Sequence, residues 1–155
     1  MFKALVVVMV LVVVGLGVYF LYFKNPVNTT FGKVTIGNKV FAVEVADTPY
    51  KKEQGLSNRN SIGLGTDGML FVFDVPARYA FWMKDMRFVL DFVWIKDDRV
   101  VWVDSNVAPP KPGETLASFS PPEEVNYVLE LPEGMVQKYG IDKGNIVKIS
   151  LPDKK

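Results

Sequence analysis

One stretch of the chain constrains its folding more than any other, the apolar run over residues 4–23. These 20 residues include no charged, Asn, Gln, Ser or Thr side chain, and Lys3 and Lys24 flank them. A helix of about 20 residues rises about 30 Å, which matches the hydrocarbon core of a bilayer. Aromatic residues gather at the C-terminal end of the run, where rings favour the membrane interface. We therefore predict a transmembrane anchor, or an uncleaved signal, over residues 1–24, with the membrane as a partner through residues 4–23.

A cleavable signal peptide is the main alternative for this run. Such a peptide has an apolar core of about 7–15 residues followed by a small-x-small cleavage site. The run here is longer and no such site follows it, although Gly15 and Gly17 form a small-x-small pattern inside it. Flanking positive charges are nearly balanced, so the orientation rests on the short N-terminal tail staying in the cytoplasm. We expect a single-pass membrane protein whose globular domain is extracytoplasmic.

The composition after the anchor excludes several classes of function. Of the 18 basic residues only Lys3 precedes the run, so 17 basic residues face 17 acidic ones in the remainder. A neutral domain argues against nucleic acid as a partner, because neutralising phosphates requires an excess of Lys and Arg. The chain has no Cys and no His, which excludes thiol and imidazole catalysis and zinc sites built from these ligands. We expect neither a metal nor another cofactor.

Short strands separated by turn signals dominate the rest of the chain. Gly37-Asn38 suits a hairpin turn, and Thr48 before Pro49 is typical of a helix start. We predict strands over 34–36, 39–45, 69–74, 80–84, 88–95, 100–103, 126–131 and 145–151, short helices after Pro49 and over 134–139, and a loop over 109–124. The strands 88–95 and 100–103 are apolar on both faces, so we expect both to be central in the sheet.

This order of elements shows no repeated βαβ pattern, which favours antiparallel pairing. We predict a mainly β fold, a compact antiparallel barrel or sandwich with one or two short helices, preceded by one N-terminal transmembrane helix. The predicted organisation is an anchor over 1–24, a linker over 25–32 and one globular domain over 33–155.

A series of short motifs runs through the domain in a fixed order: Val43-Glu44-Val45-Ala46, Gly55-Leu56 with Arg59, Gly68-Met69-Leu70-Phe71, Phe81-Trp82-Met83-Lys84, Leu90-Asp91, Tyr127 to Pro132 with Gly134, and Gly140-Ile141 with Gly144. The series resembles an uncharacterised conserved family, the domain of unknown function 192, over residues 34–151. The resemblance implies a compact, mainly β fold and, in many members, an N-terminal signal or anchor. It implies no established activity. This chain has Ser57 where the family often has Met, and Asp85-Met86 where Asn-Thr is common.

Three carboxylates lie in otherwise apolar strands. They are Glu44, Asp91 and Glu130, and an unpaired buried carboxylate is costly, so each requires a partner. Arg59 and Lys84 are the candidate counter-ions. One interpretation is a polar pocket formed by all five residues, in which paired carboxylates act as acid and base. The other is a structural ion-pair network, and the sequence identifies no catalytic residue.

Aromatic and sulfur-containing residues suggest further sites. Phe81 and Trp82 could stack on a ligand, although aromatic residues in short strands, such as Trp94 and Trp102, are more often part of the core. Two metal sites are less favoured interpretations. Cu(I) could be bound by the thioethers of Met69, Met83, Met86 and Met135, but methionines more often serve in ordinary packing. Calcium could be bound by Asp97-Asp98 and Asp104, but such residues are common in turns. The proline-rich loop over 109–122 could be bound by a partner as an extended polyproline-like segment, although such a loop is more often a stiff crossover, and its length would suit a lid or rim.

The function predicted from these features is a non-catalytic binding or accessory module tethered to the membrane. Its polar pocket would take a small polar or saccharide ligand, or an envelope protein. The alternatives are an acid–base hydrolase that uses Glu44, Asp91 or Glu130, and a purely structural component of a membrane complex. The absence of a nucleophile–base motif, a phosphate loop and a metal signature favours binding.

Overall fold

A computed structural model describes residues 29–152 of the chain. The predicted anchor over 1–24 and the first part of the predicted linker lie outside this range. Within residues 29–152, no helix is long and apolar enough to cross a membrane. The elements in order are β1 (Thr30–Ile36), β2 (Lys39–Ala46), α2 (Pro49–Gln54), β3 (Gly68–Ala77), β4 (Phe81–Trp82), β5 (Leu90–Lys96), β6 (Arg99–Val107), β7 (Ser118–Phe119), β8 (Val125–Pro132), α3 (Met135–Tyr139) and β9 (Val147–Ser150).

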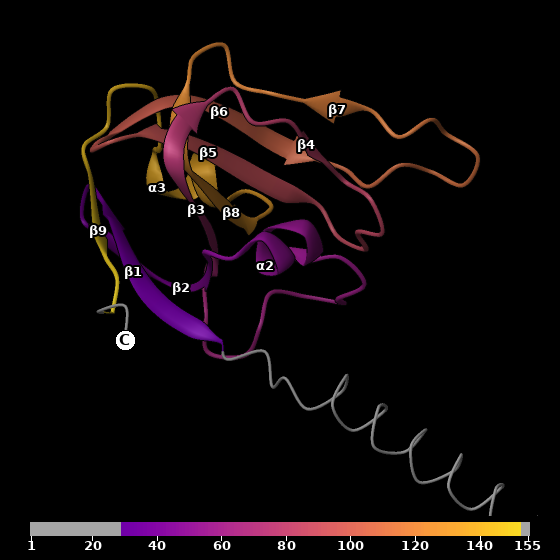
Figure 1. The fold of residues 1–155 in the computed structure, drawn as a ribbon, viewed down its shortest axis with the longest axis horizontal. Helices are drawn as coiled ribbons and strands as arrows, with labels where there is room; N and C mark the ends of the chain where they lie inside the picture. Colours follow the sequence, from indigo (N-terminus) through magenta and orange to yellow (C-terminus); the bar gives the residue numbers. More distant parts are fainter. Residues whose placement is uncertain (1–28, 153–155) are drawn as a thin grey trace, which may run out of the picture.

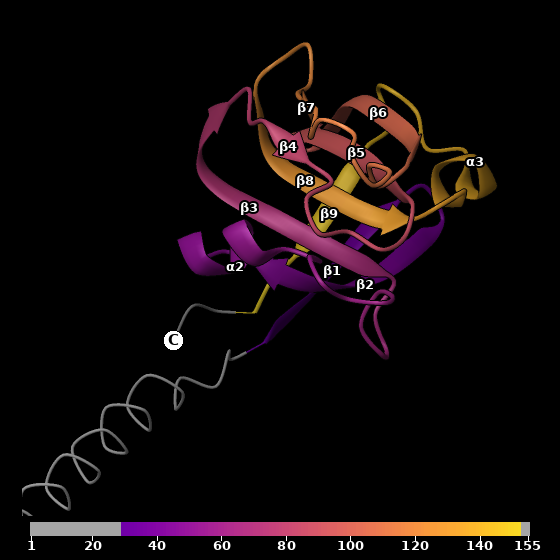
Figure 2. The same cartoon turned by 90° about the vertical axis from the view of Figure 1, so that its right-hand side faces the viewer.

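Seven of these strands form one curled sheet in the order β6-β5-β8-β3-β2-β1-β9. The sheet wraps into a half-barrel, with α2 and α3 at opposite sides of it (Figures 1 and 2). Its edges contact each other at one isolated bridge, where Val147 N–H donates to the Asp98 carbonyl at 2.7 Å and Val100 N–H donates to the Asn145 carbonyl at 3.0 Å. The prediction of a mainly β fold with one or two short helices is confirmed, and the described residues form two.

Apolar clusters cover both faces of the central strands of the sheet, whereas β1, β6 and β9, at or next to the ends of the sheet order, each have exposed residues. The interior holds one apolar cluster: Val34, Ile36, Phe41, Val43, Val45, Leu70, Val93, Ile95, Val100, Leu129, Leu131, Val136, Ile141 and Val147. The outer face holds a second: Ala46, Leu56, Met69, Phe71, Met83, Leu90, Phe92, Trp94, Val101, Val125 and Val128. Because side chains alternate along a strand, β5 supplies residues to both clusters, which explains its continuous apolar sequence.

A separate pair of short strands, β4 and β7, helps to cover the outer face. Phe81 of β4 pairs with Phe119 of β7, and both rings make edge contacts with Phe92 of β5, with centroids 6.0 and 4.8 Å from that ring. Figure 1 shows β7 at the upper right of the view, with β4 below it. Strand β7 lies within the segment 109–124, which was predicted to be a loop throughout.

The predicted turn at Gly37-Asn38, the predicted start of α2 and the predicted end of α3 are confirmed. Gly37 has φ = 57° at the turn between β1 and β2. Thr48 caps α2, its Oγ1 accepting from the Lys51 N–H, and Pro49 is the first helical residue. Gly140 adopts the left-handed conformation that ends α3.

Three predictions about the strands were wrong or incomplete. β1 begins at Thr30, inside the predicted linker. β3 continues through Pro76, which was expected in a turn, because the ladder with β8 is interrupted by an irregularity between Val72 and Ala77. β6 was predicted to be central but lies at one end of the sheet order, joined to the residues before β9 only by an isolated bridge.

The pairing of β2 with β3 is parallel, and every other strand pair in the described part is antiparallel. A parallel pair requires a crossover, and here the crossover consists of α2 and the loop over residues 55–67. The sequence interpretation, which found no βαβ pattern, missed this unit. The crossover places α2 beside the outer face, where the candidate site lies.

Candidate functional site

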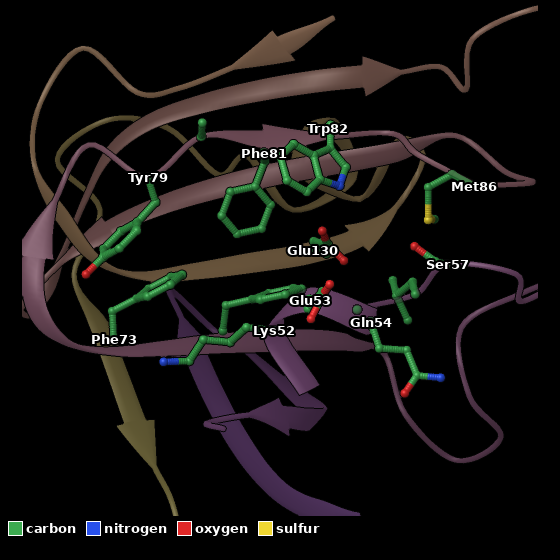
Figure 3. Close-up of a pocket in the computed structure, with 14 residues that line it drawn as sticks. Lys52, Glu53, Gln54, Ser57, Phe73, Tyr79, Phe81, Trp82, Met86 and Glu130 are labelled. Carbon is green, nitrogen blue, oxygen red and sulfur yellow. The ribbon is translucent and has the colours of Figure 1, made fainter. Parts of the chain in front are cut away.

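A cavity of about 350 Å³ opens between α2 and the segment that leads from β3 into β4. Figure 3 shows its walls, with the aromatic side chains on one side and the end of α2 on the other. The lining residues are Lys52, Glu53, Gln54, Gly55, Leu56, Ser57, Phe71, Phe73, Tyr79, Ala80, Phe81, Trp82, Met86 and Glu130. The volume and the mixture of an apolar lining with a few polar groups are typical of a small-molecule site.

Glu130 of β8 is the deepest polar residue of this lining. It is 6% exposed, and its Oε2 is buried without a hydrogen-bond partner. Burial raises the pKa of the Glu130 carboxyl to about 8, although the nearby charge of Arg59 partly opposes this. At neutral pH the free protein therefore holds Glu130 largely protonated, with a buried polar atom that nothing in the described chain satisfies.

The strand register explains which of the predicted carboxylates share this face. Glu44 is opposite Met69, Met69 is opposite Glu130, and Glu130 is opposite Phe92. Glu44 and Glu130 thus lie two strands apart in one row of the outer face, with a backbone separation of roughly 10 Å. Asp91 precedes Phe92, so its side chain points to the interior face instead.

Glu44 is engaged by a charged partner. Its Oε1 accepts from Arg59 Nη1 at 2.7 Å and its Oε2 from Arg59 Nη2 at 3.0 Å. The Gly63 backbone packs against this carboxylate so closely that a Cβ at position 63 would overlap Glu44 Oε1. The pair borders a second cavity of only about 40 Å³, which shares Gln54 and Gly55 with the larger one.

Asp91 is also satisfied, but by backbone groups. Its Oδ1 accepts from the Asn106 N–H at 2.8 Å and its Oδ2 from the Val136 N–H at 2.9 Å, and the residue is fully buried. Val136 lies in the first turn of α3, whose N-cap, Gly134, has no side chain to supply this hydrogen bond. The structure therefore does not bring Asp91 together with Glu44, Arg59 and Glu130.

Lys84 is exposed and does not line the cavity. Its backbone carbonyl accepts a hydrogen bond from Ser57 Oγ at 3.0 Å, which ties the segment after β4 to the end of α2. Ser57 and Met86, two of the residues that differ from the common family pattern, both line the cavity. The differences noted in the sequence thus fall on the site itself.

The predicted stacking residues have different environments. Phe81 lies among the rings of the outer core, with centroids 5.0 Å from Phe71 and 5.3 Å from Trp94, and presents only part of its surface to the cavity. Trp82 is 50% exposed at the cavity wall. Both residues therefore border the site, and Trp82 is the more accessible.

Several lining residues were missed in the sequence. Phe73 and Tyr79 stack with ring centroids 3.6 Å apart, and the Lys52 Nζ lies 4.6 Å from the centroid of Phe73. Lys52 comes from α2, as do Glu53 and Gln54, and α2 contains no buried residue. The helix sequence PYKKEQ has no Leu, Ile, Val, Met or Phe, and this was the available signal that α2 does not pack into the core.

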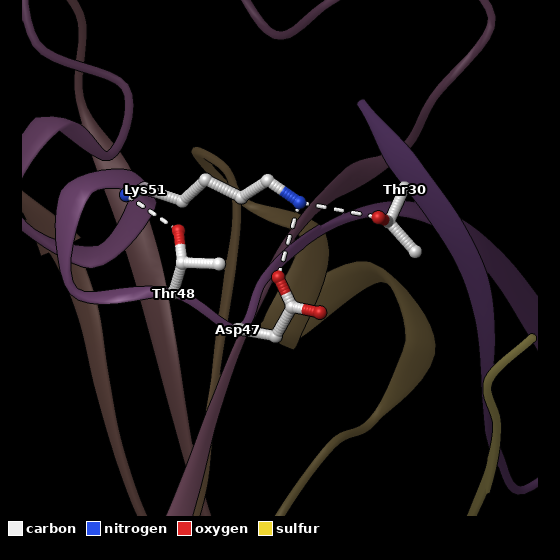
Figure 4. A network of polar contacts seen from close by, with 4 residues as sticks. All are labelled: Thr30, Asp47, Thr48 and Lys51. Carbon is white, nitrogen blue, oxygen red and sulfur yellow. Dashed lines mark hydrogen bonds and ion pairs between the residues drawn. The ribbon is translucent and has the colours of Figure 1, made fainter. Parts of the chain in front are cut away.

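A polar network fixes α2 beside the sheet. The Lys51 Nζ donates to Asp47 Oδ1 at 3.0 Å and to Thr30 Oγ1 at 3.1 Å, while its backbone N–H donates to Thr48 Oγ1 at 3.3 Å. Figure 4 shows these contacts joining the first turn of the helix to β1. One lysine thus sets the position of the helix that forms one wall of the cavity.

The weaker metal hypotheses gain no geometric support. Within residues 29–152, no group of three or more acidic side chains is placed to hold a metal ion. Asp104 accepts from the indole nitrogens of Trp94 at 2.7 Å and Trp102 at 3.1 Å. Met69 and Met83 are buried in the outer core, whereas Met135 packs against the interior one.

Comparison with known proteins assigns the family. The model of DUF192, described as an uncharacterized ACR, matches residues 32–149. The chain belongs to the DUF192 family. It is 26% identical over 131 residues to a UPF0127 protein of Thermococcus gammatolerans, covering 83% of this chain and 77% of that protein.

Two solved structures share the fold. A crystal structure from Sinorhizobium meliloti, described as a "putative transcription regulator", has a TM-score of 0.69 and 29% identity, covering 81% of this chain and 98% of that one. A protein of unknown function from Novosphingobium aromaticivorans has a TM-score of 0.64 and 29% identity, covering 80% and 89%. The resemblance found in the sequence is confirmed, and these relatives carry no established activity to transfer.

Proposed function

We propose that this member of the DUF192 family is a binding module that takes a small ligand into the cavity beside α2. The observation that carries the proposal is Glu130, a buried carboxyl with an unpartnered oxygen at the inner end of a cavity of about 350 Å³. Buried polar groups in folded proteins are nearly always hydrogen-bonded to protein or to ordered water. The unpartnered oxygen of a cavity-lining residue therefore supports a site at which a ligand group replaces water as the partner.

The lining suits a ligand of modest size with one apolar face. The half-exposed ring of Trp82 offers a flat contact, the stacked pair of Phe73 and Tyr79 adds apolar surface, and polar side chains of α2 border the opening. Small polar molecules, saccharides among them, have this combination of a stackable face and hydrogen-bonding groups. A volume near the lower end of the range for ligand sites favours a single ring or a short chain over an oligomer.

Binding is favoured over acid–base hydrolysis by the state of the three carboxylates. Both carboxylate oxygens of Glu44 accept hydrogen bonds from Arg59, and both oxygens of Asp91 accept hydrogen bonds from backbone N–H groups. A hydrolase would have to combine Glu130 with Glu53, an exposed lining residue of α2. Mass spectrometry of a bound ligand after long incubation separates the two functions, since a binding module returns the ligand unchanged.

The location of the module follows from the sequence alone. The apolar run over residues 4–23 would tether the domain to a membrane, with the cavity on the extracytoplasmic side. A tethered domain of this kind would meet small molecules of the envelope or an envelope protein partner. A purely structural role would not explain why the buried Glu130 oxygen has no hydrogen-bond partner in the described chain.

The test is a thermal-shift screen of the full-length chain in detergent micelles against saccharides, amines and other small polar molecules. A ligand that binds the folded state raises the melting temperature by mass action. We expect at least one class to raise it, and Trp82→Ala to abolish the shift. The matched control is Trp102→Ala, a partly exposed tryptophan on β6 outside the cavity lining. A shift that survives Trp82→Ala, or the absence of any shift, contradicts the proposal.

A further inference from the structure

We infer that the ligand of this cavity carries an organic ammonium group, which sits against Glu130 and the surrounding aromatic rings. The inference rests on the proposed binding function and names the chemical class of the ligand. It is carried by three features of the lining: its charges, its ring faces and the single deep polar group.

The net charge of the cavity lining favours a ligand with one positive charge. The charged lining residues are Lys52, Glu53 and Glu130. Lys52 is held over the Phe73 ring, and Arg59, whose charge acts on Glu130, donates from both terminal nitrogens to Glu44. Once Glu130 is ionised, the lining therefore has one more negative charge than positive, and no cationic side chain of the described chain donates to Glu130. A ligand ammonium would complete the pair.

The rings of the cavity are suited to the same group. Five aromatic residues line it: Phe71, Phe73, Tyr79, Phe81 and Trp82. Aromatic faces attract ammonium groups, tryptophan most strongly, and the contact strengthens when water is excluded. Lys52 over Phe73 shows that this attraction already operates at the cavity. The Tyr79 hydroxyl donates to the Val75 carbonyl, so the polar group of this residue is already engaged.

The depth of the site argues for a ligand with a single polar head. Glu130 is the one charged lining residue that is buried, whereas Glu53 and Gln54 are exposed residues of α2. A sugar would bring several hydroxyl groups inside, and each would need a partner. An ammonium attached to a small apolar body needs one carboxylate and surrounding rings.

The ammonium class has a proton signature that a neutral ligand lacks. Glu130 is largely protonated in the free protein at neutral pH. A cation binds best to the ionised carboxylate, so binding would transfer the Glu130 proton to the buffer. Affinity should then rise about tenfold per pH unit below the pKa and level off above about pH 8. A neutral ligand that accepts a hydrogen bond from protonated Glu130 would show the opposite trend.

The experiment is titration calorimetry of the full-length chain in detergent, with 3,3-dimethylbutylamine as the probe and the neutral 3,3-dimethyl-1-butanol as the matched control. The primary ammonium of the probe has the N–H donors that the unpartnered Glu130 oxygen requires. Titrations in two buffers of different ionisation enthalpy measure proton release. We expect the amine to bind more tightly than the alcohol by tenfold or more between about pH 8 and 9, with release of nearly one proton at neutral pH. Glu130→Gln should remove both the preference and the proton release, whereas Glu133→Gln, an exposed neighbour outside the lining, should retain both.

Three kinds of result would overturn the inference. Equal binding of the amine and the alcohol, or binding of N-acetylglucosamine that weakens as the pH rises, would reject the ammonium class and retain a small-ligand pocket. A complete lack of binding by the amine, the alcohol and the saccharide, together with no ligand in the thermal-shift screen, would reject the pocket itself. Proton release that persists in Glu130→Gln would assign the linkage to another group and also reject the inference.

Discussion

Arg59, in the crossover loop between the parallel strands β2 and β3, hydrogen-bonds both carboxylate oxygens of Glu44 on β2. Glu44 lies on β2, whereas Arg59 lies in the loop after α2, and the two hydrogen bonds measure 2.7 and 3.0 Å. The paired geometry fixes the loop as well as neutralising the charge. Because this loop continues from the helix that lines the cavity, the ion pair positions the site without facing the ligand.

Replacing Arg59 with Met should therefore destabilise the domain by about 1–3 kcal/mol, since it leaves the buried Glu44 carboxylate unpaired. The value is below that for fully buried pairs because the Arg59 side chain is 35% exposed. Chemical denaturation at neutral pH measures the loss. The double variant with Glu44→Gln should recover part of it, because the uncompensated charge is gone. A double variant as unstable as the sum of the single ones would contradict this account.

A second prediction concerns Gly63, which packs against the same carboxylate. The residue does not have a positive φ, so alanine is compatible with the backbone, but its Cβ would overlap Glu44 Oε1. Gly63→Ala should displace Glu44 from Arg59 and cost about 1–3 kcal/mol of unfolding free energy. In the double variant with Glu44→Ala the cost should largely disappear, and a double-mutant cycle measures this coupling. Two independent, additive losses would show that the overlap is relieved elsewhere.

Asp91 should prove purely structural. In Asp91→Asn one acceptor oxygen becomes an N–H₂ group, which would face the backbone N–H of either Asn106 or Val136. We expect a loss of about 2–3 kcal/mol in unfolding free energy, with ligand affinity unchanged because Asp91 points to the opposite face of the sheet from Glu130. The control is Asp142→Asn, in an exposed turn, with a loss under about 1 kcal/mol. A loss of ligand affinity without a loss of stability would place Asp91 in the site.

How far the sequence predicted this site depends on the distance along the chain between partners. Glu44 and Arg59 were recognised as opposite charges needing partners, and Glu130 as a costly carboxylate in an apolar strand. The partners of Asp91 are backbone groups 15 and 45 residues away, and no side-chain pattern reports which N–H a fold leaves unsatisfied. Lys84 was a plausible counter-ion because it is a cation, but its side chain is exposed. Its backbone carbonyl accepts a hydrogen bond from Ser57 Oγ.

The fold likewise divides into features set by neighbouring residues, which the sequence predicted, and features set by distant ones, which it did not. The β1–β2 hairpin and the start of α2 were predicted because Gly37-Asn38 and Thr48-Pro49 act within a few residues. The parallel pairing of β2 with β3 depends on contacts across the whole crossover, and the path of β3 through Pro76 depends on an irregular ladder with β8. Local chemistry therefore identified most elements, whereas the arrangement that creates the cavity depended on non-local pairing.

The pH dependence of stability should report on Glu130. Its pKa is raised from 4.5 to about 8 by burial, so between these values the folded protein binds a proton that the unfolded chain has lost. The slope of unfolding free energy with pH is then negative, and stability is lost as the pH rises through this window, by up to about 1.4 kcal/mol per unit. Glu130→Gln should flatten this part of the profile, as measured by denaturation at several pH values without ligand.

The matched control for that profile is Glu133→Gln, which removes an exposed carboxylate from the same segment and should leave the slope unchanged. Above about pH 8 the Glu130→Gln variant should be more stable than the natural protein, because it no longer buries a charge. A natural protein whose stability is constant across the window would mean that Glu130 keeps an ordinary pKa, which requires a partner that the described residues do not show.

The apolar run over residues 4–23 leads to a prediction about the whole chain. If it spans a bilayer, the protein should stay with the membrane after alkaline carbonate washing, and a protease added from the extracytoplasmic side should reach the domain. Val13→Lys places a charge near the middle of the run and should reduce insertion, at a cost of about 3 kcal/mol on insertion scales. Lys24→Ala, at the edge, should have little effect. Full release of the natural protein by carbonate, or its protection from the external protease, would contradict the predicted anchor or its orientation.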